Sequence, residues 1–553
     1  MAIFSSTLDV LNAQENQSSP NISSPKPETD LWDRDALPEG AIARYGATDR
    51  NPYAVGVLGL RYSNDGRLLA IRDQRQQIRI LDFEKRELQA VLPTVSHRDF
   101  VFTPDDQLIA VGDRRSIRFW DIKAKEEVRQ IDHPGFHLAS NSDRQNFSAA
   151  GRDEVIRYSW PLPSEPKRFD TEMVSGTIVP VGLSRDGRLA LFHNMRHSEL
   201  LDTNTGKPVP KTAIKGCQKA VFSTDSKQMV AFNPGLTQLA FFDLRNAKRY
   251  HYTISDRQRF STAAFSNDGR FLYTGNFANQ IVVWDLLTRT EIDRIEGHGA
   301  RVMAIAASPT GLLRLVSGAS AIHDRSVIFW DLRSRLFPEQ KLIGEVDWDR
   351  LWEDLGREDS ATSLDATRRL IQILQDDSAA YETLETMMEL VKSEGNVNDL
   401  VSQLDDAKYL AREEASAKLR SMLGEIRPEL ERHLEDASPE AKWRIRRILE
   451  AVTAQPAFLT AESRRAARTV FVLELLATSE AKETLELISQ LSGQHVAVEE
   501  SLAALGRLSQ SFVRCSDRWL NISGTISRGP SKNHGLDSRD PAPSERDHQR
   551  RRD

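Results

Sequence analysis

Two histidines, His193 and His197, have the spacing that comes closest to a metal site. Ligands four residues apart share a face only on a helix, whereas this stretch is predicted to be a strand end and its turn, so we expect no metal there. The two cysteines, Cys217 and Cys515, lie far apart and form neither a metal motif nor a disulfide framework. No HExxH, GxxxxGKS/T or GxSxG motif occurs. We therefore predict a protein that is not an enzyme, with no catalytic residue, no cofactor and no metal.

Arginine is the second residue type that could contribute to function, by binding a partner and not by catalysis. Loops expected on one face of the fold carry Arg75, Arg98, Arg115, Arg152, Arg196, Arg257, Arg259 and Arg325. A guanidinium offers a planar fork that matches a carboxylate, so these loops predict a docking surface for an acidic partner. Phe260, beside Arg259, favours an interface at that loop. The ordinary alternative is solvated loop charge, balanced by Asp73, Asp99, Asp113, Asp153, Asp256 and Asp324.

These loops belong to a unit of about 40 residues that recurs along the chain. The fullest copy runs from Glu296 to Asp331 and contains a strand-turn-strand core and a closing strand. Seven such closing strands end at Asp82, Asp121, Trp160, Asp202, Asp243, Asp285 and Asp331, at intervals of 39, 39, 42, 41, 42 and 46 residues. Short strands at this period predict the blades of a propeller.

Each copy also has an inner turn between its first two strands. The turns are rich in Asp, Asn and Gly, which suit a tight reversal. They begin at Ser63, Thr103, Asn141, Ser184, Ser223, Ser266 and Ser308.

The repeats resemble the WD-repeat family over roughly residues 41 to 335, which implies a seven-bladed β-propeller. Intact Trp-Asp pairs close only three copies, at Trp120-Asp121, Trp284-Asp285 and Trp330-Asp331. The resemblance also implies an internal hydrogen-bond set, which is complete only in the last copy as His298, Ser317, Asp324 and Trp330. The other blades are therefore expected to hold together mainly by apolar packing.

A ring of blades needs a strand that joins its last blade to its first, because open sheet edges invite unwanted pairing. The resemblance implies that an N-terminal strand is lent to the final blade. We favour Ala41 to Tyr45 for this strand over the alternative, Lys341 to Val346, because Pro338 disturbs the approach to the latter.

After the propeller the apolar period changes from two to 3.6 residues. Trp348, Leu351, Trp352 and Leu355 share one helical face, and the two tryptophans either clamp the helices to the propeller or belong to the helical core alone, which we slightly favour. Further helices are predicted at Ser360–Leu374, Ser378–Lys392, Val397–Gln403, Leu410–Leu423, Ile426–Leu434, Pro439–Val452, Ala461–Ala477, Ala481–Gln490 and Val496–Leu508.

The segment Leu404 to Asp436 resembles a HEAT-like repeat, and Asp406, Arg412, Ala415 and Leu419 fall where that pattern has an acid, a base and small or apolar residues. The resemblance implies a curved array of stacked helix pairs. The order of propeller and helices is similar to a group of bacterial WD-repeat proteins with an α-helical C-terminal region.

At 553 residues the chain is expected to contain two or three domains. We predict a disordered segment at 1–36, a seven-bladed β-propeller at 37–340, an α-helical HEAT-like domain at 341–515 and a disordered tail at 516–553. No apolar run approaches the ~20 residues of a membrane helix, so we expect no membrane insertion. The small net charge of −6 argues against a nucleic-acid partner.

The N-terminal stretch Ala2 to Leu11 has no basic start and is interrupted by polar residues, so we predict a cytoplasmic location. Export remains the alternative if a start codon further upstream restores a signal. The leading hypothesis for function is a non-enzymatic scaffold, monomeric by itself, that binds one or more proteins through a propeller face and a helical array. The alternatives are a hydrolase with a site at the propeller channel and an exported or envelope binding protein.

Overall fold

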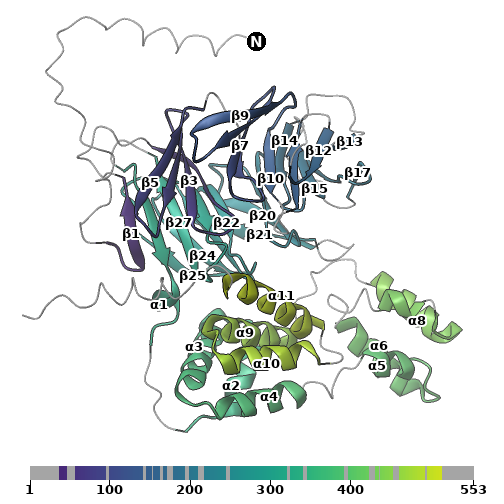
Figure 1. Ribbon diagram of the computed structural model, residues 1–553. Coiled ribbons are helices and arrows are strands. Elements are labelled where there is room, and N and C mark those ends of the chain that lie inside the picture. The colour runs from purple at the N-terminus through teal and green to yellow at the C-terminus, as the bar shows by residue number, and fades with distance from the viewer. Residues whose placement is uncertain are drawn as a thin grey trace, which may run out of the picture.

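A seven-bladed β-propeller is followed by an α-helical region (Figure 1). The computed structural model describes residues 37–46, 56–94, 99–140, 145–151, 154–161, 166–170, 179–193, 198–209, 217–244, 250–320, 324–339, 345–390, 397–421, 430–434, 436–451, 460–491 and 495–512. The segments predicted to be disordered, 1–36 and 516–553, lie outside these residues.

Each blade is a sheet of four antiparallel strands in sequence order. Blades 1 to 3 contain β2 (Val57–Tyr62), β3 (Leu68–Asp73), β4 (Ile78–Asp82), β5 (Glu87–Leu92); β6 (Asp99–Phe102), β7 (Leu108–Gly112), β8 (Ile117–Asp121), β9 (Glu126–Ile131); and β10 (His137–Ser140), β11 (Asn146–Ala150), β12 (Glu154–Ser159), β13 (Lys167–Asp170). Blades 4 to 6 contain β14 (Val179–Leu183), β15 (Leu189–His193), β16 (Ser198–Asp202), β17 (Lys207–Pro208); β18 (Lys219–Phe222), β19 (Gln228–Phe232), β20 (Gln238–Asp243), β21 (Tyr250–Ser255); and β22 (Phe260–Phe265), β23 (Phe271–Asn276), β24 (Ile281–Asp285), β25 (Thr290–Ile295).

Blade 7 closes the ring. It contains β26 (Val302–Ala307), β27 (Arg314–Ala319) and β28 (Val327–Asp331), and its fourth strand is β1 (Ala41–Tyr45) from the N-terminal end. β1 runs antiparallel to β28, with Ala43 opposite Phe329 and Tyr45 opposite Val327. The predicted closure by Ala41 to Tyr45 is therefore confirmed.

The inner turns share one side-chain pattern. Ser63 Oγ donates to Asp65 Oδ1 over 2.6 Å and accepts from the N–H of Leu68 over 2.8 Å. The same bonds begin at Thr103, Ser184, Ser223 and Ser266. These bonds stabilise the turn, because the Ser or Thr hydroxyl accepts a backbone N–H at the point where the turn begins the second strand. The turn predicted at Asn141 lies outside the described residues.

The antiparallel order of the strands gives the propeller two distinct faces. The turns between first and second strands, and between third and fourth strands, lie on one face, which we call the inner-turn face. The connections between second and third strands, and from one blade to the next, lie on the opposite face, which we call the loop face.

Apolar contact between neighbouring blades supplies most of the propeller core. Between blades 1 and 2, for example, Ile78 and Ile80 pack with Phe100, Phe102 and Ile109, and all five are buried. The indole N–H groups of the tryptophans at 120 and 160 are buried without a hydrogen-bond partner among the described residues. Blade 7 is an exception, and in blade 6 the indole N–H of Trp284 donates to Thr274 over 2.9 Å. The other blades thus rely on apolar packing, as the incomplete repeats predict.

Every regular element that the structure describes after β28 is a helix. These elements are α1 (Arg333–Leu336), α2 (Trp348–Leu355), α3 (Ser360–Asp376), α4 (Ala380–Leu390), α5 (Val397–Gln403), α6 (Tyr409–Ser421), α8 (Pro439–Ala451), α9 (Ala461–Leu476), α10 (Ser479–Ser489) and α11 (His495–Phe512), with residues 430–434 also helical. Asp347, Asp359, Thr460 and Thr478 cap four of these helices by accepting a backbone N–H.

The helices do not share a single core along the chain. α2, α3, α4, α9, α10 and α11 share a core with blades 6 and 7, whereas α5, α6 and α8 surround a core of their own. α9 is buried on nearly all sides, so it lies at the centre of the first group and brings the chain back beside α2 and α3. Trp348 and Trp352 pack against the core that the propeller and these helices share.

Candidate interaction surfaces and central channel

The last blade contains a chain of buried hydrogen bonds. His298 Nδ1 lies 2.8 Å from Asp324 Oδ2, and His298 Nε2 lies 2.7 Å from Ser317 Oγ. The indole N–H of Trp330 donates to the same Ser317 Oγ over 2.7 Å. Burial opposes ionisation of Asp324, but the bonds from His298 and Ser326 outweigh it and hold the pKa of Asp324 below its usual value. The network joins β27 and β28 to the segment that precedes β26, and it has a structural role.

Four of the predicted docking arginines, Arg75, Arg115, Arg257 and Arg259, have exposed side chains, and Arg325 is half-buried. Arg75 follows β3, Arg115 follows β7, Arg257 and Arg259 lie between β21 and β22, and Arg325 precedes β28. All five positions are therefore on the loop face. Arg98, Arg152 and Arg196 lie outside the described residues.

The described acids that were expected to balance these arginines pair with other cations, and Asp153 lies outside the described residues. Asp73 pairs with Arg79 at 3.3 Å, Asp256 with Arg294 at 3.0 Å, and Asp324 with His298. Asp99 and Asp113 pair with Arg61 and Arg118 at 3.5 and 3.8 Å. Among the described residues, the side chains of Arg115, Arg257 and Arg259 form no ion pair with a carboxylate. Their charge is therefore available to an outside group, which supports the docking interpretation over the ordinary one.

The aromatic contact predicted at Phe260 is absent from this surface. Phe260 is the first residue of β22 and is completely buried in the core between blades 5 and 6. The strand begins one residue earlier than a loop interpretation requires, so its first side chain points inward. A partner at this loop would meet Arg257 and Arg259 alone.

The strand and turn predicted around the two histidines give no metal site in the described part of the chain. His193 Nδ1 lies 3.0 Å from Ser198 Oγ, and His197 lies outside the described residues. Among the residues that the structure describes, no three His, Cys, Asp or Glu side chains gather as a metal would require.

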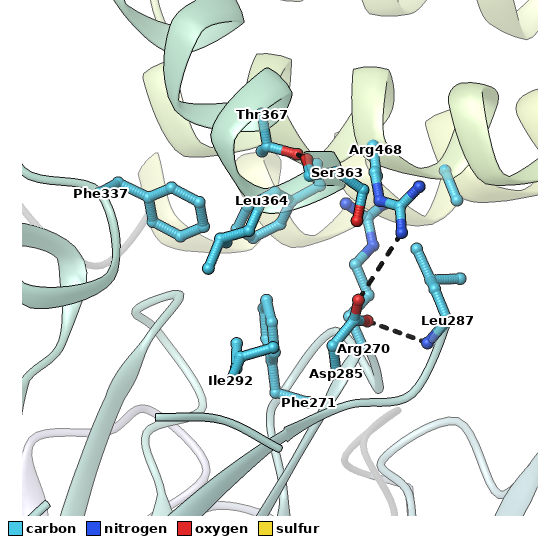
Figure 2. A pocket seen from close by; sticks show the side chains of 12 residues that line it. Arg270, Phe271, Asp285, Leu287, Ile292, Phe337, Ser363, Leu364, Thr367 and Arg468 are labelled. Atoms are coloured by element: carbon cyan, nitrogen blue, oxygen red, sulfur yellow. Dashed lines mark hydrogen bonds and ion pairs between the residues drawn. The ribbon is translucent and has the colours of Figure 1, made fainter. Parts of the chain in front are cut away.

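A buried ion pair fixes the helices to the inner-turn face of blade 6 (Figure 2). Arg468 of α9 lies 3.7 Å from Asp285, the last residue of β24, which also accepts the N–H of Leu287 over 2.9 Å. Phe271, Ile292, Phe337 and Leu364 line the same seam. The pocket between them measures about 30 Å³, which is room for little more than a water molecule. The two regions therefore meet as one packed interface.

Three arginines of α9 also satisfy the last carbonyl groups of α2. Arg464 Nε donates to Gly356 O over 2.7 Å, and Arg465 Nε donates to Trp352 O over 2.8 Å. Arg468 donates to the carbonyls of Leu355 and Arg357. Helix C-terminal carbonyls have no partner within their helix, so these bonds tie α2 and α9 together.

The separate helical unit exposes large apolar side chains beside arginines. Tyr409, Leu410 and Trp443 are 62%, 72% and 51% exposed. The guanidinium of Arg447 lies 5.2 Å from the centre of the Trp443 ring. Arg444 pairs with Glu413 at 2.8 Å and so joins α8 to α6. Aromatic and arginine side chains of this kind are enriched in protein interfaces.

The first strands of all seven blades line a central channel of about 400 Å³. The ionisable groups on its described wall are Arg61, Tyr62, Arg72, Asp99, His137, Arg185 and Lys219. Asp99 lies 3.5 Å from Arg61 and 3.6 Å from His137, and it accepts the N–H of Leu138 over 3.0 Å. Burial opposes its ionisation, but these partners hold its pKa well below the usual range, so it is a weak base. The hydrolase interpretation gains no residue from it.

Sequence reasoning missed both the channel charges and the α9 ion pair. The charged residues and the histidine of the channel come from five different blades, 1 to 5, with one or two from each blade. No short sequence motif therefore indicates them. The one signal in the sequence is a basic residue at a first-strand position where other blades have small or apolar residues. Lys219, for example, occupies the position that Thr262 has in blade 6 and Ala304 has in blade 7.

Residues 289–331 match the family model described as WD domain, G-beta repeat. The match contains the complete His298, Ser317, Asp324 and Trp330 network. The other six blades share the four-stranded sheet of blade 7, but their described residues do not form the full set of polar partners.

Three proteins show what the chain is similar to. The guanine nucleotide-binding protein subunit beta of Saccharomyces cerevisiae is 24% identical over 230 residues, which cover 39% of this chain and 52% of that protein. Protein FIZZY-RELATED 3 of Arabidopsis thaliana is 22% identical over 307 residues, which cover 54% of each chain. The chain spans about half the length of these curated relatives. The beta-propeller domain of Myceliophteria_thermophila Cps50 (Swd1) aligns with a TM-score of 0.42 at 14% identity, over 52% of this chain and 99% of that one.

None of the helices that the structure describes combines the length and the apolar composition that crossing a membrane demands.

Proposed function

We propose that this protein is a non-enzymatic scaffold that binds a protein partner with an acidic surface through the loop face of its propeller. The observation that carries the proposal is that the helices contact one face of the propeller and the exposed arginines lie on the other. The ion pairs that join described helices to propeller turns, Arg468–Asp285, Arg270–Glu500 and Lys227–Glu499, all lie on the inner-turn face. The exposed Arg115, Arg257 and Arg259 lie on the other face.

The comparisons support the same class of function. The yeast relative is by its name a subunit, and so a component of a larger assembly. An assembly role suits a rigid ring whose loops carry charge, because the ring presents those loops at little cost in conformational entropy. The exposed Tyr409, Leu410 and Trp443 surface would give the scaffold a second contact for protein, in keeping with the proposed HEAT-like arrangement of α5 to α8.

Charge reversal of Arg257 and Arg259 to Glu tests the proposal. We expect partner recovery in affinity purification to fall by about tenfold or more, because both attraction and on-rate depend on complementary charge. The matched control is Lys123→Glu with Lys125→Glu, a pair with the same spacing in an exposed turn of the inner-turn face. Equal recovery by the two double variants and the native protein, measured by quantitative mass spectrometry, would remove the loop face from the account.

A further inference from the structure

Positive charge predominates on the described wall of the central channel. Arg61, Arg72, Arg185 and Lys219 line it, and Asp99 is the one carboxylate among the described lining residues. Asp99 is already engaged by Arg61 and by the N–H of Leu138. The channel wall therefore has an excess of cations over anions.

Arg185 reaches across the channel at its inner-turn end. It belongs to the inner turn of blade 4, and its Nη2 donates over 3.1 Å to Oδ1 of Asn64, in the inner turn of blade 1 on the opposite side of the ring. The partner is a neutral amide, so the bond orients the guanidinium without neutralising it.

Lys219 lies further along the channel, on the first strand of blade 5. Its Nζ is 3.5 Å from the carbonyl oxygen of Ser261, which is again a neutral group. The side chain of Lys219 is exposed to the channel, and its enclosure by the channel wall lowers the pKa of its ammonium group. The neighbouring Arg72 and Arg301 lower that pKa further. Burial and then Arg61 also lower the pKa of Arg185, against the opposing charge of Asp106.

These charges do not serve the packing of the blades. Lys219 stands three residues before the end of its strand, where β22 has Thr262 and β26 has Ala304. Bringing like charges together inside a protein raises its free energy, because the low dielectric weakens screening. A cluster of this kind is explained if an anion occupies the space between the cations.

We propose that the central channel binds a small, multiply charged anion of the phosphate class, such as a diphosphate, held by Lys219 and the neighbouring Arg72, with Arg185 at the inner-turn end of the same channel. Guanidinium groups match phosphate oxygens in a bidentate manner, and an ammonium adds a point charge. The volume of about 400 Å³ accommodates a diphosphate or a small molecule that carries one. The site lies inside the ring and is separate from the arginines of the loop face, so it does not depend on the scaffold proposal.

The test is isothermal titration of the full-length protein with pyrophosphate, with ADP and with citrate, all at one ionic strength. We expect saturable 1:1 binding of pyrophosphate that is about tenfold or more weaker in Lys219→Gln and in Arg72→Gln, because each loses one charge-assisted bond. Tighter binding of ADP than of pyrophosphate would assign the phosphate to a nucleotide, and equal or weaker binding would assign it to the phosphate group alone.

Lys123→Gln and Lys125→Gln are the matched controls, since each removes one exposed positive charge outside the channel and should leave the affinity within about twofold. Thermal unfolding without ligand separates binding from folding: Lys219→Gln should unfold at the same or a higher temperature than the native protein, because it relieves repulsion. Three results would each overturn the proposal: no saturable binding of pyrophosphate, equal affinity in the channel variants, or citrate binding as tight as pyrophosphate.

Discussion

Deletion of residues 37–46, which include β1, is expected to open the ring and to lower the unfolding temperature more than any single substitution in the propeller. β1 is the fourth strand of blade 7, and it covers Val327 and Phe329 of β28, which are almost completely buried. Without it, the ladder along β28 loses its partners and an apolar edge is exposed to solvent. We therefore also expect self-association, which size-exclusion chromatography would detect.

A point variant gives the same test without shortening the chain. Tyr45 is 5% exposed and belongs to the core between blades 7 and 1, so Tyr45→Ala should reduce the free energy of unfolding by about 3–5 kcal/mol. Tyr409→Ala, the same change at a side chain that is 62% exposed, should stay within about 0.5 kcal/mol. Urea unfolding followed by circular dichroism measures both. An unchanged midpoint after the loss of β1 would show that another segment closes the ring.

Arg468→Met is expected to loosen the seam between the propeller and the helices. The change leaves Asp285 buried without its cation and takes a donor from the carbonyl groups of Leu355 and Arg357. Loss of one partner of a buried ion pair typically costs about 3–5 kcal/mol. Arg465→Met is the control on the same helix, because Arg465 is half-buried and donates to the Trp352 carbonyl, so about 1 kcal/mol is expected.

The cost of Arg468→Met should depend on pH. Burial raises the pKa of Asp285 above its ordinary value even though Arg468 opposes the shift. Because the folded state holds this proton more tightly than the unfolded state, stability falls as the pH rises from the unfolded pKa through the raised folded pKa. Without Arg468 the shift grows, so the variant should be weakest near neutral pH and should recover in acid.

The double variant Asp285→Asn with Arg468→Met completes this test. It removes the charge that Arg468→Met strands, so it should be more stable than Arg468→Met alone at neutral pH and should show no such recovery in acid. Identical pH profiles for the single and double variants would contradict the assignment of the seam to this ion pair.

The periodic parts of the structure could be predicted because each repeat carries its own signal. The recurring closing strands indicated seven blades, Ala41 to Tyr45 was the strand that closes them, and helix α5 has the predicted bounds of Val397 to Gln403. Local patterns set these elements, since apolar spacing and turn residues act within a few positions.

The parts that were missed depend on contacts between distant residues. Arg464 and Gly356 are 108 positions apart, and nothing near either residue indicates that α9 returns to cap α2. Arg185 and Asn64 meet across the channel over 121 positions. Phe260 was misplaced for a different reason: the boundary between loop and strand falls beside it, and one residue decides whether a side chain faces solvent or core.

The most direct test of the account places a photo-crosslinking amino acid in the cell-expressed protein, at Gln258 on the loop face and, separately, at Lys123 on the inner-turn face. Both side chains are exposed, and Gln258 lies between Arg257 and Arg259. We predict that irradiation joins a second protein to the chain at position 258 and not at position 123. Equal capture at both positions, or capture at position 123 alone, would contradict a scaffold that works through its loop face.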